Sequence, residues 1–109
     1  MTSRAAVEIR QTETVFHALA HMQRREILLV LRFRGGEMTA GEIAERFSCS
    51  WPTTTRHLKI LERAKLLRVT KQGRERVYKL DLPKLRVTIG KWLDWFDDTQ
   101  RTIGRRQFQ

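Results

Sequence analysis

The stretch of residues 50–64 constrains the fold of this chain more than any other part of the sequence. At about 100° per residue, Leu58 and Leu61 fall on one side of a helix and make an apolar seam, with His57 at its edge. The opposite side carries hydroxyl and cationic groups, which are Thr53, Thr55, Arg56, Lys59 and Arg63. Ser50 can cap the helix, because its side-chain oxygen can accept a bond from a free backbone N–H of the first turn. The stretch therefore predicts an amphipathic helix with one apolar and one basic face.

A second helix start lies just upstream, where Thr39 is followed three residues later by Glu42. In this spacing the hydroxyl and the carboxylate each accept a bond from the other residue's backbone N–H. The helix that opens here ends near Phe47, and residues 48–50 turn the chain into the basic helix. Two short helices joined by so short a turn are typical of a helix-turn-helix, here over residues 39–64. The alternative is an ordinary pair of amphipathic helices whose basic face is simply solvated.

The charge of the chain favours a polyanionic partner. Its 109 residues include 22 Lys and Arg against 12 Asp and Glu, a formal net charge of +10. Such an excess attracts polyanions, and nucleic acid is the commonest of them. The sequence has no apolar run of membrane-spanning length and no signal peptide, so we expect no membrane partner and a cytoplasmic location. One cysteine excludes an internal disulfide, and the length fits a single domain over residues 1–109.

Two more helices are predicted before the helix-turn-helix. Residues 1–11 are polar and weakly patterned, so we expect them to be frayed or loosely helical. Helical spacing of apolar residues begins after Thr12, and either Thr12 or Thr14 can cap this first helix. A second helix is predicted over residues 23–34, because apolar residues recur there at helical spacing and the glycine pair 35–36 stops it.

After the basic helix the apolar period changes from helical to alternating. Residues 67–71 and 76–80 alternate, and residues 72–75 form a turn between them, which predicts a β-hairpin. The cationic residues toward its tip are Lys71, Arg74 and Arg76. A hairpin directly after a recognition helix is the wing of a winged-helix domain, so we predict a wing over residues 67–80. The alternative is a generic edge hairpin whose basic residues prevent aggregation.

The last predicted helix, residues 83–99, carries a large apolar face. Its members at helical spacing are Leu85, Ile89, Trp92, Leu93, Trp95 and Phe96. This face can fold back on the chain's own core, but four preceding helices already serve that core. Its size favours burial against a second copy of the chain. The basic, unpatterned residues 101–109 are expected to be mobile.

Together these motifs resemble the ArsR-type winged-helix repressors. The similar segments are Phe16 to Leu28, Thr39 to Ala44, Ser50 to Leu61, Lys65 to Leu67 and Gly73 to Leu80. They extend over a core of roughly residues 12–98, in the right order and spacing. The resemblance implies a mainly α fold with a small β-hairpin, in the order α-α-α-α-β-β-α. It also implies a homodimer held by the first and last helices, which blocks transcription from a palindromic operator. The residues expected at the dimer contact are Val15, Phe16, Leu19, Ile89, Trp92, Trp95 and Phe96.

The chain departs from the family pattern at three places. His21 and Met22 stand where the family usually has Asp-Pro, which leaves open how the second helix is capped. Lys65 follows the basic helix where glycine is common, so a left-handed conformation there would be strained. Trp51 replaces a common polar residue, and it either shields the helix start or stacks on a DNA sugar or thymine methyl.

The residues that bind metals in sensing members of the family are missing here. The third helix has no cysteine pair, and the last helix has aspartates but no histidine, so we predict no metal and no cofactor. His17 and His21 have a chelating spacing, although two ligands make a weak site and a capping or interfacial role is favoured. Cys49 lies near a helix start, which can lower a thiol pKa, but a lone thiol in a turn is more often inert.

Binding to DNA would divide between phosphate contacts and base contacts. Phosphate neutralisation is assigned to Arg56, Lys59, Arg63, Lys71, Arg74 and Arg76. Base reading is assigned to Thr53, Thr55 and Arg56 near the start of the helix. Ser50 and Trp51 complete the predicted contact set together with His57, which is either a core-edge or a phosphate-contacting residue.

Two other function classes have weaker support in the sequence. An enzyme has little support, because no nucleophile lies in a base-and-orienter context and no glycine loop can cradle phosphate. A non-specific architectural protein that binds DNA or RNA through the same basic surface is the second alternative. These residues do not specify an inducer. The alternatives are a small molecule, a partner protein, thiol chemistry, or no signal beyond the concentration of the protein itself.

Overall fold

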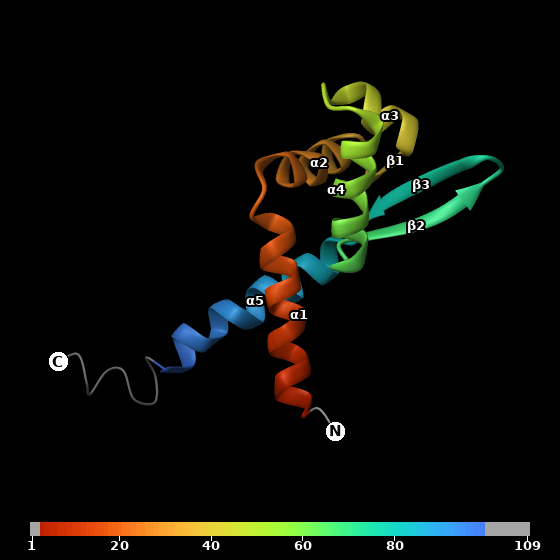
Figure 1. Ribbon diagram of the computed structural model, residues 1–109. Helices are drawn as coiled ribbons and strands as arrows, with labels where there is room; N and C mark the ends of the chain where they lie inside the picture. Colours follow the sequence, from red (N-terminus) through yellow and green to blue (C-terminus); the bar gives the residue numbers. More distant parts are fainter. Residues whose placement is uncertain (1–2, 100–109) are drawn as a thin grey trace.

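The computed structural model describes residues 3–99, which form five helices and three strands (Figure 1). In chain order the elements are α1 (Arg4–Leu19), α2 (Met22–Phe33), β1 (Glu37–Thr39), α3 (Ala40–Arg46), α4 (Trp51–Arg63), β2 (Leu67–Gln72), β3 (Glu75–Leu80) and α5 (Leu82–Thr99). The mainly helical winged helix-turn-helix is therefore confirmed. No helix in the described part of the chain is both long and apolar enough to cross a lipid bilayer.

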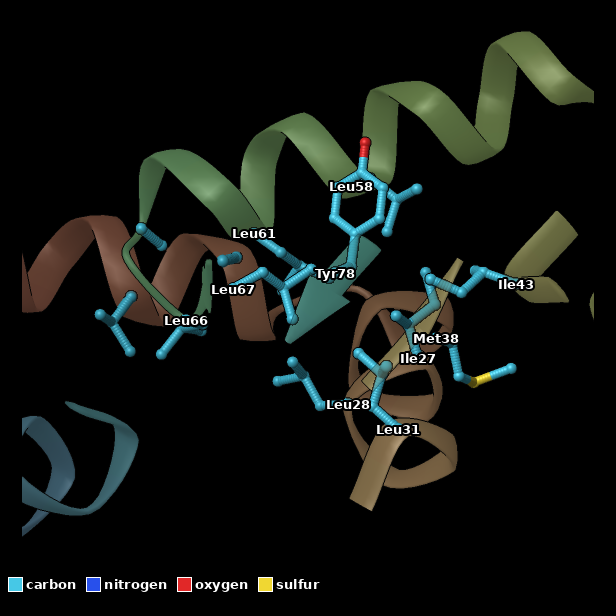
Figure 2. Close-up of a cluster of buried hydrophobic side chains, with 13 residues drawn as sticks. Ile27, Leu28, Leu31, Met38, Ile43, Leu58, Leu61, Leu66, Leu67 and Tyr78 are labelled. Carbon is cyan, nitrogen blue, oxygen red and sulfur yellow. The ribbon is translucent and has the colours of Figure 1, made fainter. Parts of the chain in front are cut away.

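The core forms where α4 meets α2 and the sheet. Figure 2 shows Leu58 and Leu61 of α4 beside Tyr78 of β3, with Leu31 of α2 on the other side of the cluster. Leu61 and Leu31 are completely buried, as the apolar seam of residues 50–64 predicts. The cluster consists of Val15, Ala18, Ile27, Leu28, Leu31, Met38, Ile43, Leu58, Leu61, Ala64, Leu66, Leu67 and Tyr78.

The sheet has one strand more than the predicted hairpin. β3 lies in the middle, with β2 on one side and β1 on the other, and both pairs are antiparallel. The predicted order of elements lacked β1, and the observed order is α-α-β-α-α-β-β-α. β1 has three residues, too few to show an alternating pattern, and it exists because β3 supplies its hydrogen bonds. Met38 in β1 pairs with Tyr78 in β3, and both are buried.

Both helix starts in the helix-turn-helix have the predicted caps. The Thr53 N–H donates to Ser50 Oγ at 3.3 Å, so α4 begins directly after Ser50. At α3 the Glu42 N–H donates to Thr39 Oγ1 at 3.1 Å, and the Thr39 N–H donates to Glu42 Oε1 at 3.0 Å. Each side-chain oxygen satisfies a donor that the helix cannot pair internally.

The first helix begins much earlier than predicted. α1 starts at Arg4, and its cap is Ser3, whose Oγ accepts from the Ala6 N–H at 3.1 Å. Thr12 and Thr14 are not caps, because each hydroxyl donates to the backbone carbonyl four residues earlier. The early turns show no core-facing pattern because they lie beyond the chain's own core, where Val7 and Ile9 are exposed.

The C-terminus of α4 closes with a lysine in a strained conformation. Lys65 has φ +65°, the left-handed region that the usual glycine would occupy without strain. The Leu66 N–H donates to the Leu61 carbonyl and the Lys65 N–H donates to the Glu62 carbonyl. This pair of bonds is the Schellman motif, and it sends the chain from α4 directly into β2.

Replacing Lys65 with glycine should stabilise the protein. The left-handed region costs an L-residue about 1–2 kcal/mol, and the greater freedom of glycine in the unfolded chain offsets about 0.5–1 kcal/mol of the gain. We expect Lys65→Gly to raise the free energy of unfolding by about 0.5–1 kcal/mol in a urea titration. Lys65→Ala is the matched control, because it keeps the β-carbon and should bring no gain. Equal stabilisation by both substitutions would contradict this account.

Candidate nucleic-acid interface

Helix α4 has two chemically distinct faces, as predicted. Leu58 and Leu61 are buried, while Thr55, Arg56, Lys59 and Arg63 are exposed. Trp51 at the first position of the helix is 57% exposed, which leaves its ring available for a contact outside the chain. Because the apolar seam fixes which side of α4 faces the core, the hydroxyl and cationic side chains face solvent together.

Hydrogen bonds within the chain order the start of α4. The Ser50 hydroxyl donates to Thr53 Oγ1 at 3.0 Å while Ser50 Oγ accepts from the Thr53 N–H. Cys49 Sγ lies 3.3 Å from the hydroxyl of Thr54, which is buried under the same turn. Thr53 is half-buried by these contacts, whereas Thr55 is exposed. Side-chain hydrogen bonds therefore fix the conformation of the first turn, and the helix presents Thr55 and Arg56 outward.

The wing adds a second cationic surface next to α4. β2 and β3 project from the body of the molecule (Figure 1), and their two-residue loop uses Gly73 at φ +63°. The side chains near the tip are exposed, which are Lys71, Arg74 and Arg76. Lys71 and Arg76 are directly paired across the two strands. β2 also contacts α4, so the wing starts beside the helix.

No carboxylate in the described part of the chain forms an ion pair with the cationic side chains of α4 or of the wing tip. Among residues 3–99 the ion pairs are Arg4–Glu8, Arg34–Glu42 and Arg68–Asp81, and all lie elsewhere. Arg68 at the root of the wing is 3.1 Å from Asp81, so it differs from the cations at the tip. The charge on α4 and the tip is therefore free to neutralise the phosphates of a nucleic acid.

His57 does not lie on this surface. It is 5% exposed and packs inside, so its side chain is a core-edge group and leaves the predicted set of DNA contacts. Its Nδ1 lies 3.2 Å from Nη1 of Arg24, and its Nε2 lies 3.1 Å from Oε1 of Gln23. From its position at the edge of the apolar seam, His57 could have been either buried or exposed. It is buried because Gln23 and Arg24 of α2 bind its ring.

Arg24 is the residue of this region that the sequence analysis missed. It is 7% exposed, and its Nε donates to the Ala18 carbonyl at 2.8 Å and its Nη2 to the His17 carbonyl at 3.2 Å. A signal was present, because Arg24 precedes Ile27, Leu28 and Leu31 at helical spacing and so takes the first position of an apolar stripe. A cation inside such a stripe is buried only when it is hydrogen-bonded.

The surroundings of His57 favour its neutral form. Burial is the main cause that lowers the pKa of His57, and the charges of His21, Arg24 and Arg56 lower it further. Burial also lowers the pKa of Arg24 from that of free arginine. At α3, the hydrogen bond from the Thr39 N–H lowers the pKa of Glu42, which keeps the capping carboxylate ionised.

His21 is the N-cap of α2, in the place where the family usually has Asp-Pro. Its Nδ1 accepts from the Gln23 N–H at 3.2 Å, and its ring lies 4.6 Å from the ring of His57. His17 is exposed on α1, and Cys49 is half-buried. Within residues 3–99 no three His, Cys, Asp or Glu side chains lie close enough together to hold a metal ion.

The residues expected at a dimer contact fall into two groups. Val15 is 1% exposed in the core and is not available to a partner, whereas Leu19 and Ile89 are half-buried against that core. Phe16 lies edge-on to Trp92 with ring centroids 5.0 Å apart where α1 and α5 cross (Figure 1). The other members are exposed on α5, with Trp92 at 41%, Trp95 at 74% and Phe96 at 57%.

The sequence of the chain is similar to those of known transcriptional regulators. The model of a helix-turn-helix domain family matches residues 19–70. The transcriptional repressor SdpR of Bacillus subtilis (strain 168) is 37% identical over 83 residues, which are 76% of this chain and 90% of that repressor. An HTH-type transcriptional regulator of Mycobacterium tuberculosis is 38% identical over 72 residues, 66% of this chain and 65% of that protein.

Solved structures agree with these relatives. An ArsR-like transcriptional regulator from Rhodococcus sp. RHA1 superposes with a TM-score of 0.78 at 26% identity, covering 91% of this chain and 92% of that one. The homodimeric winged helix-turn-helix DNA-binding domain of a possible ArsR-family regulator from Mycobacterium bovis shares the fold, with a TM-score of 0.69 at 23% identity over 91% of this chain and 89% of that one.

The identity to a repressor extends over almost all of that protein, and the fold and the exposed basic helix agree with it. The chain therefore belongs to the ArsR family of winged helix-turn-helix, DNA-binding transcriptional regulators.

Proposed function

We propose that the protein is a homodimeric repressor that binds a palindromic operator, with α4 in the major groove and the wing on the flanking DNA. The observation that carries the proposal is the outer face of α4, where hydroxyl and cationic side chains stand exposed and free of internal ion pairs. A helix of this width fits the major groove of B-form DNA, where each base pair presents a distinct pattern of donors and acceptors.

Base reading is assigned to the first turns of α4. Arg56 is exposed and has the planar fork that pairs with a guanine edge, and Thr55 can contact a thymine methyl or an adenine. Thr53 joins them, although its hydroxyl is already engaged with Ser50. Phosphate contacts are assigned to Lys59, Arg63, Lys71, Arg74 and Arg76, with Ser50 and Trp51 at the edge of the contact. These give affinity without reading sequence.

A second copy of the chain would cover the outer faces of α1 and α5. Trp92 and Phe96 lie edge-on at 5.1 Å, and exposed Val7 and Ile9 extend the apolar surface along α1. A hollow of about 310 Å³ between the two helices, lined in part by Ile9 and Trp92, could receive side chains of the partner. A two-fold dimer would present two copies of α4, which matches the symmetry of a palindrome.

Repression is favoured because the relative SdpR is a transcriptional repressor. A bound dimer would act by occupying DNA, which requires neither catalysis nor a cofactor. A cytoplasmic location follows from this role, because that is where bacterial-type operators are bound. The alternative is a non-specific architectural protein, which the basic surface alone would also support.

Selection from a random duplex pool tests the proposal directly. We expect enrichment of an inverted repeat whose half-sites lie about one helical turn apart, because the two recognition helices of a dimer are spaced to match DNA. The selection is run near physiological salt, where non-specific binding is typically about 10⁻⁴ to 10⁻⁶ M. DNA binding with no enriched sequence would reject the operator and favour the architectural alternative.

Single substitutions should separate base reading from phosphate binding. Arg56→Ala removes a base contact of about 1–3 kcal/mol from each protomer, so it should weaken operator binding about 5- to 150-fold per half-site and non-specific binding much less. Arg74→Ala removes a phosphate contact, so it should weaken both equally and lower the salt slope by about one per protomer. Arg32→Ala, which removes an exposed arginine from α2, controls for the change in net charge. Equal losses from Arg56→Ala on operator and random DNA would refute its role as a base reader.

A charge placed on the α5 face should dissociate the dimer. Phe96→Asp would desolvate a carboxylate at the proposed contact, so light scattering should report a monomer and operator affinity should fall sharply. Phe33→Asp is the matched control, because Phe33 is 82% exposed on α2, outside the α1 and α5 faces. A dimer that survives Phe96→Asp, or one that Phe33→Asp dissociates, would move the contact elsewhere.

A further inference from the structure

An arginine is buried where α1, α2 and α4 meet, without a carboxylate partner among residues 3–99. The three ion pairs of the described chain do not include Arg24, although it is only 7% exposed. Its acceptors are the carbonyls of His17 and Ala18 and the Nδ1 atom of His57. The two carbonyls belong to the last turn of α1, the negative end of the helix dipole, which offsets the charge of the guanidinium.

This arrangement admits one protonation state of His57. A guanidinium can only donate, so Nδ1 of His57, 3.2 Å from Arg24, must accept. The proton of the neutral ring then lies on Nε2, which donates to Oε1 of Gln23 at 3.1 Å. A second proton on the ring would place an N–H against the N–H of Arg24 and remove the acceptor that Arg24 uses.

The charged and titratable groups that act on His57 are all basic. Arg24 and His21 face it from the start of α2, and Arg56 adjoins it on α4 itself. From α1 it is approached through Arg24, whose other bonds go to backbone carbonyls. The causes that shift the pKa of His57 include no carboxylate, so no acidic side chain there would compensate an imidazolium.

The contact joins three helices at the place where α4 is oriented. Arg24 lies in the first turn of α2 and reaches the last turn of α1, and His57 lies in the middle of α4. His57 directly follows Arg56, which lies about 100° further round α4 and is exposed. A change in how His57 sits therefore rotates or shifts the side chains proposed to read DNA.

We propose that Arg24 and His57 are positioning residues that hold α4 in its DNA-reading orientation only while His57 is neutral, so that a proton on His57 weakens operator binding. The inference rests on the proposed function, because it assumes that α4 reads the operator.

The sign of the pH dependence follows from the geometry. When α4 is held by the contact between Arg24 and His57, the charged form of the His57 ring is disfavoured. The lowered pKa of His57, caused by burial and by the neighbouring cations, agrees with this. The alignment is complete above the ordinary histidine pKa of about 6.5 and is lost as the pH falls through the lowered pKa. Each protomer can take up one proton on His57. The affinity for the operator can therefore change by at most about tenfold per pH unit for each protomer. Non-specific binding has the opposite sign, because added positive charge strengthens contact with phosphate.

The test measures the affinity of the full chain for its selected operator and for a scrambled duplex, from pH 8 to pH 5.5 at constant ionic strength. Operator affinity is expected to fall toward pH 5.5, by no more than the limit set by one proton per protomer, while affinity for the scrambled duplex holds or rises. His57→Gln keeps one donor and one acceptor without titrating, so its operator affinity should not fall with acid. His17→Gln removes an exposed histidine and should retain the wild-type profile.

Two results would overturn the inference. One is an operator affinity of the wild type that stays flat or rises on acidification, and the other is an acid-dependent loss that persists in His57→Gln. If His57→Gln does not fold, nitrogen chemical shifts of the His57 ring in the wild type decide instead. A neutral ring protonated on Nε2 supports the inference, and one protonated on Nδ1 refutes it. Failure to select any operator at pH 8 would instead reject the proposed function, which separates the two failures.

Discussion

The burial of one face of α4 is the constraint on which the rest of the molecule depends. Leu58 and Leu61 are removed from water against α2 and β3, and each buried leucine contributes about 1.5–3 kcal/mol. The same seam extends into Leu66 and Leu67, which tie the root of the wing to the core. Because the apolar side of α4 is buried, its basic side faces solvent. The same core also holds the wing.

Apolar packing of this kind does not set the orientation of α4 by itself, because hydrophobic burial is non-directional. The polar contact between Arg24 and His57 is directional, and it lies in the interior, where hydrogen bonds are strong and an unpaired group is costly. The apolar core therefore stabilises the packing of α4 against the rest of the chain. The contact between Arg24 and His57 specifies the orientation of α4 relative to α1 and α2. This division makes the orientation of the helix sensitive to a single proton.

A chain of 109 residues cannot cover all of its own apolar surface. Here the uncovered part is concentrated on the outer sides of α1 and α5, where Trp92, Trp95 and Phe96 stand at the crossing of the two helices or beyond it. The basic surface lies on α4 and the wing. The molecule thus separates a surface suited to association from a surface suited to a polyanion, and Arg24 links helix α1 of the first to helix α4 of the second.

The sequence alone determined the features that depend on neighbouring residues. The seam of α4, the caps at Ser50 and Thr39, the hairpin and the strained Lys65 all follow from local spacing and local hydrogen bonds. Only the tertiary structure decided the rest. β1 exists because β3 supplies its partners, and the first turns of α1 carry no pattern because nothing in the chain packs on them. His57 turned inward because Arg24, 33 residues away along the chain, offers a donor that only the fold brings within reach.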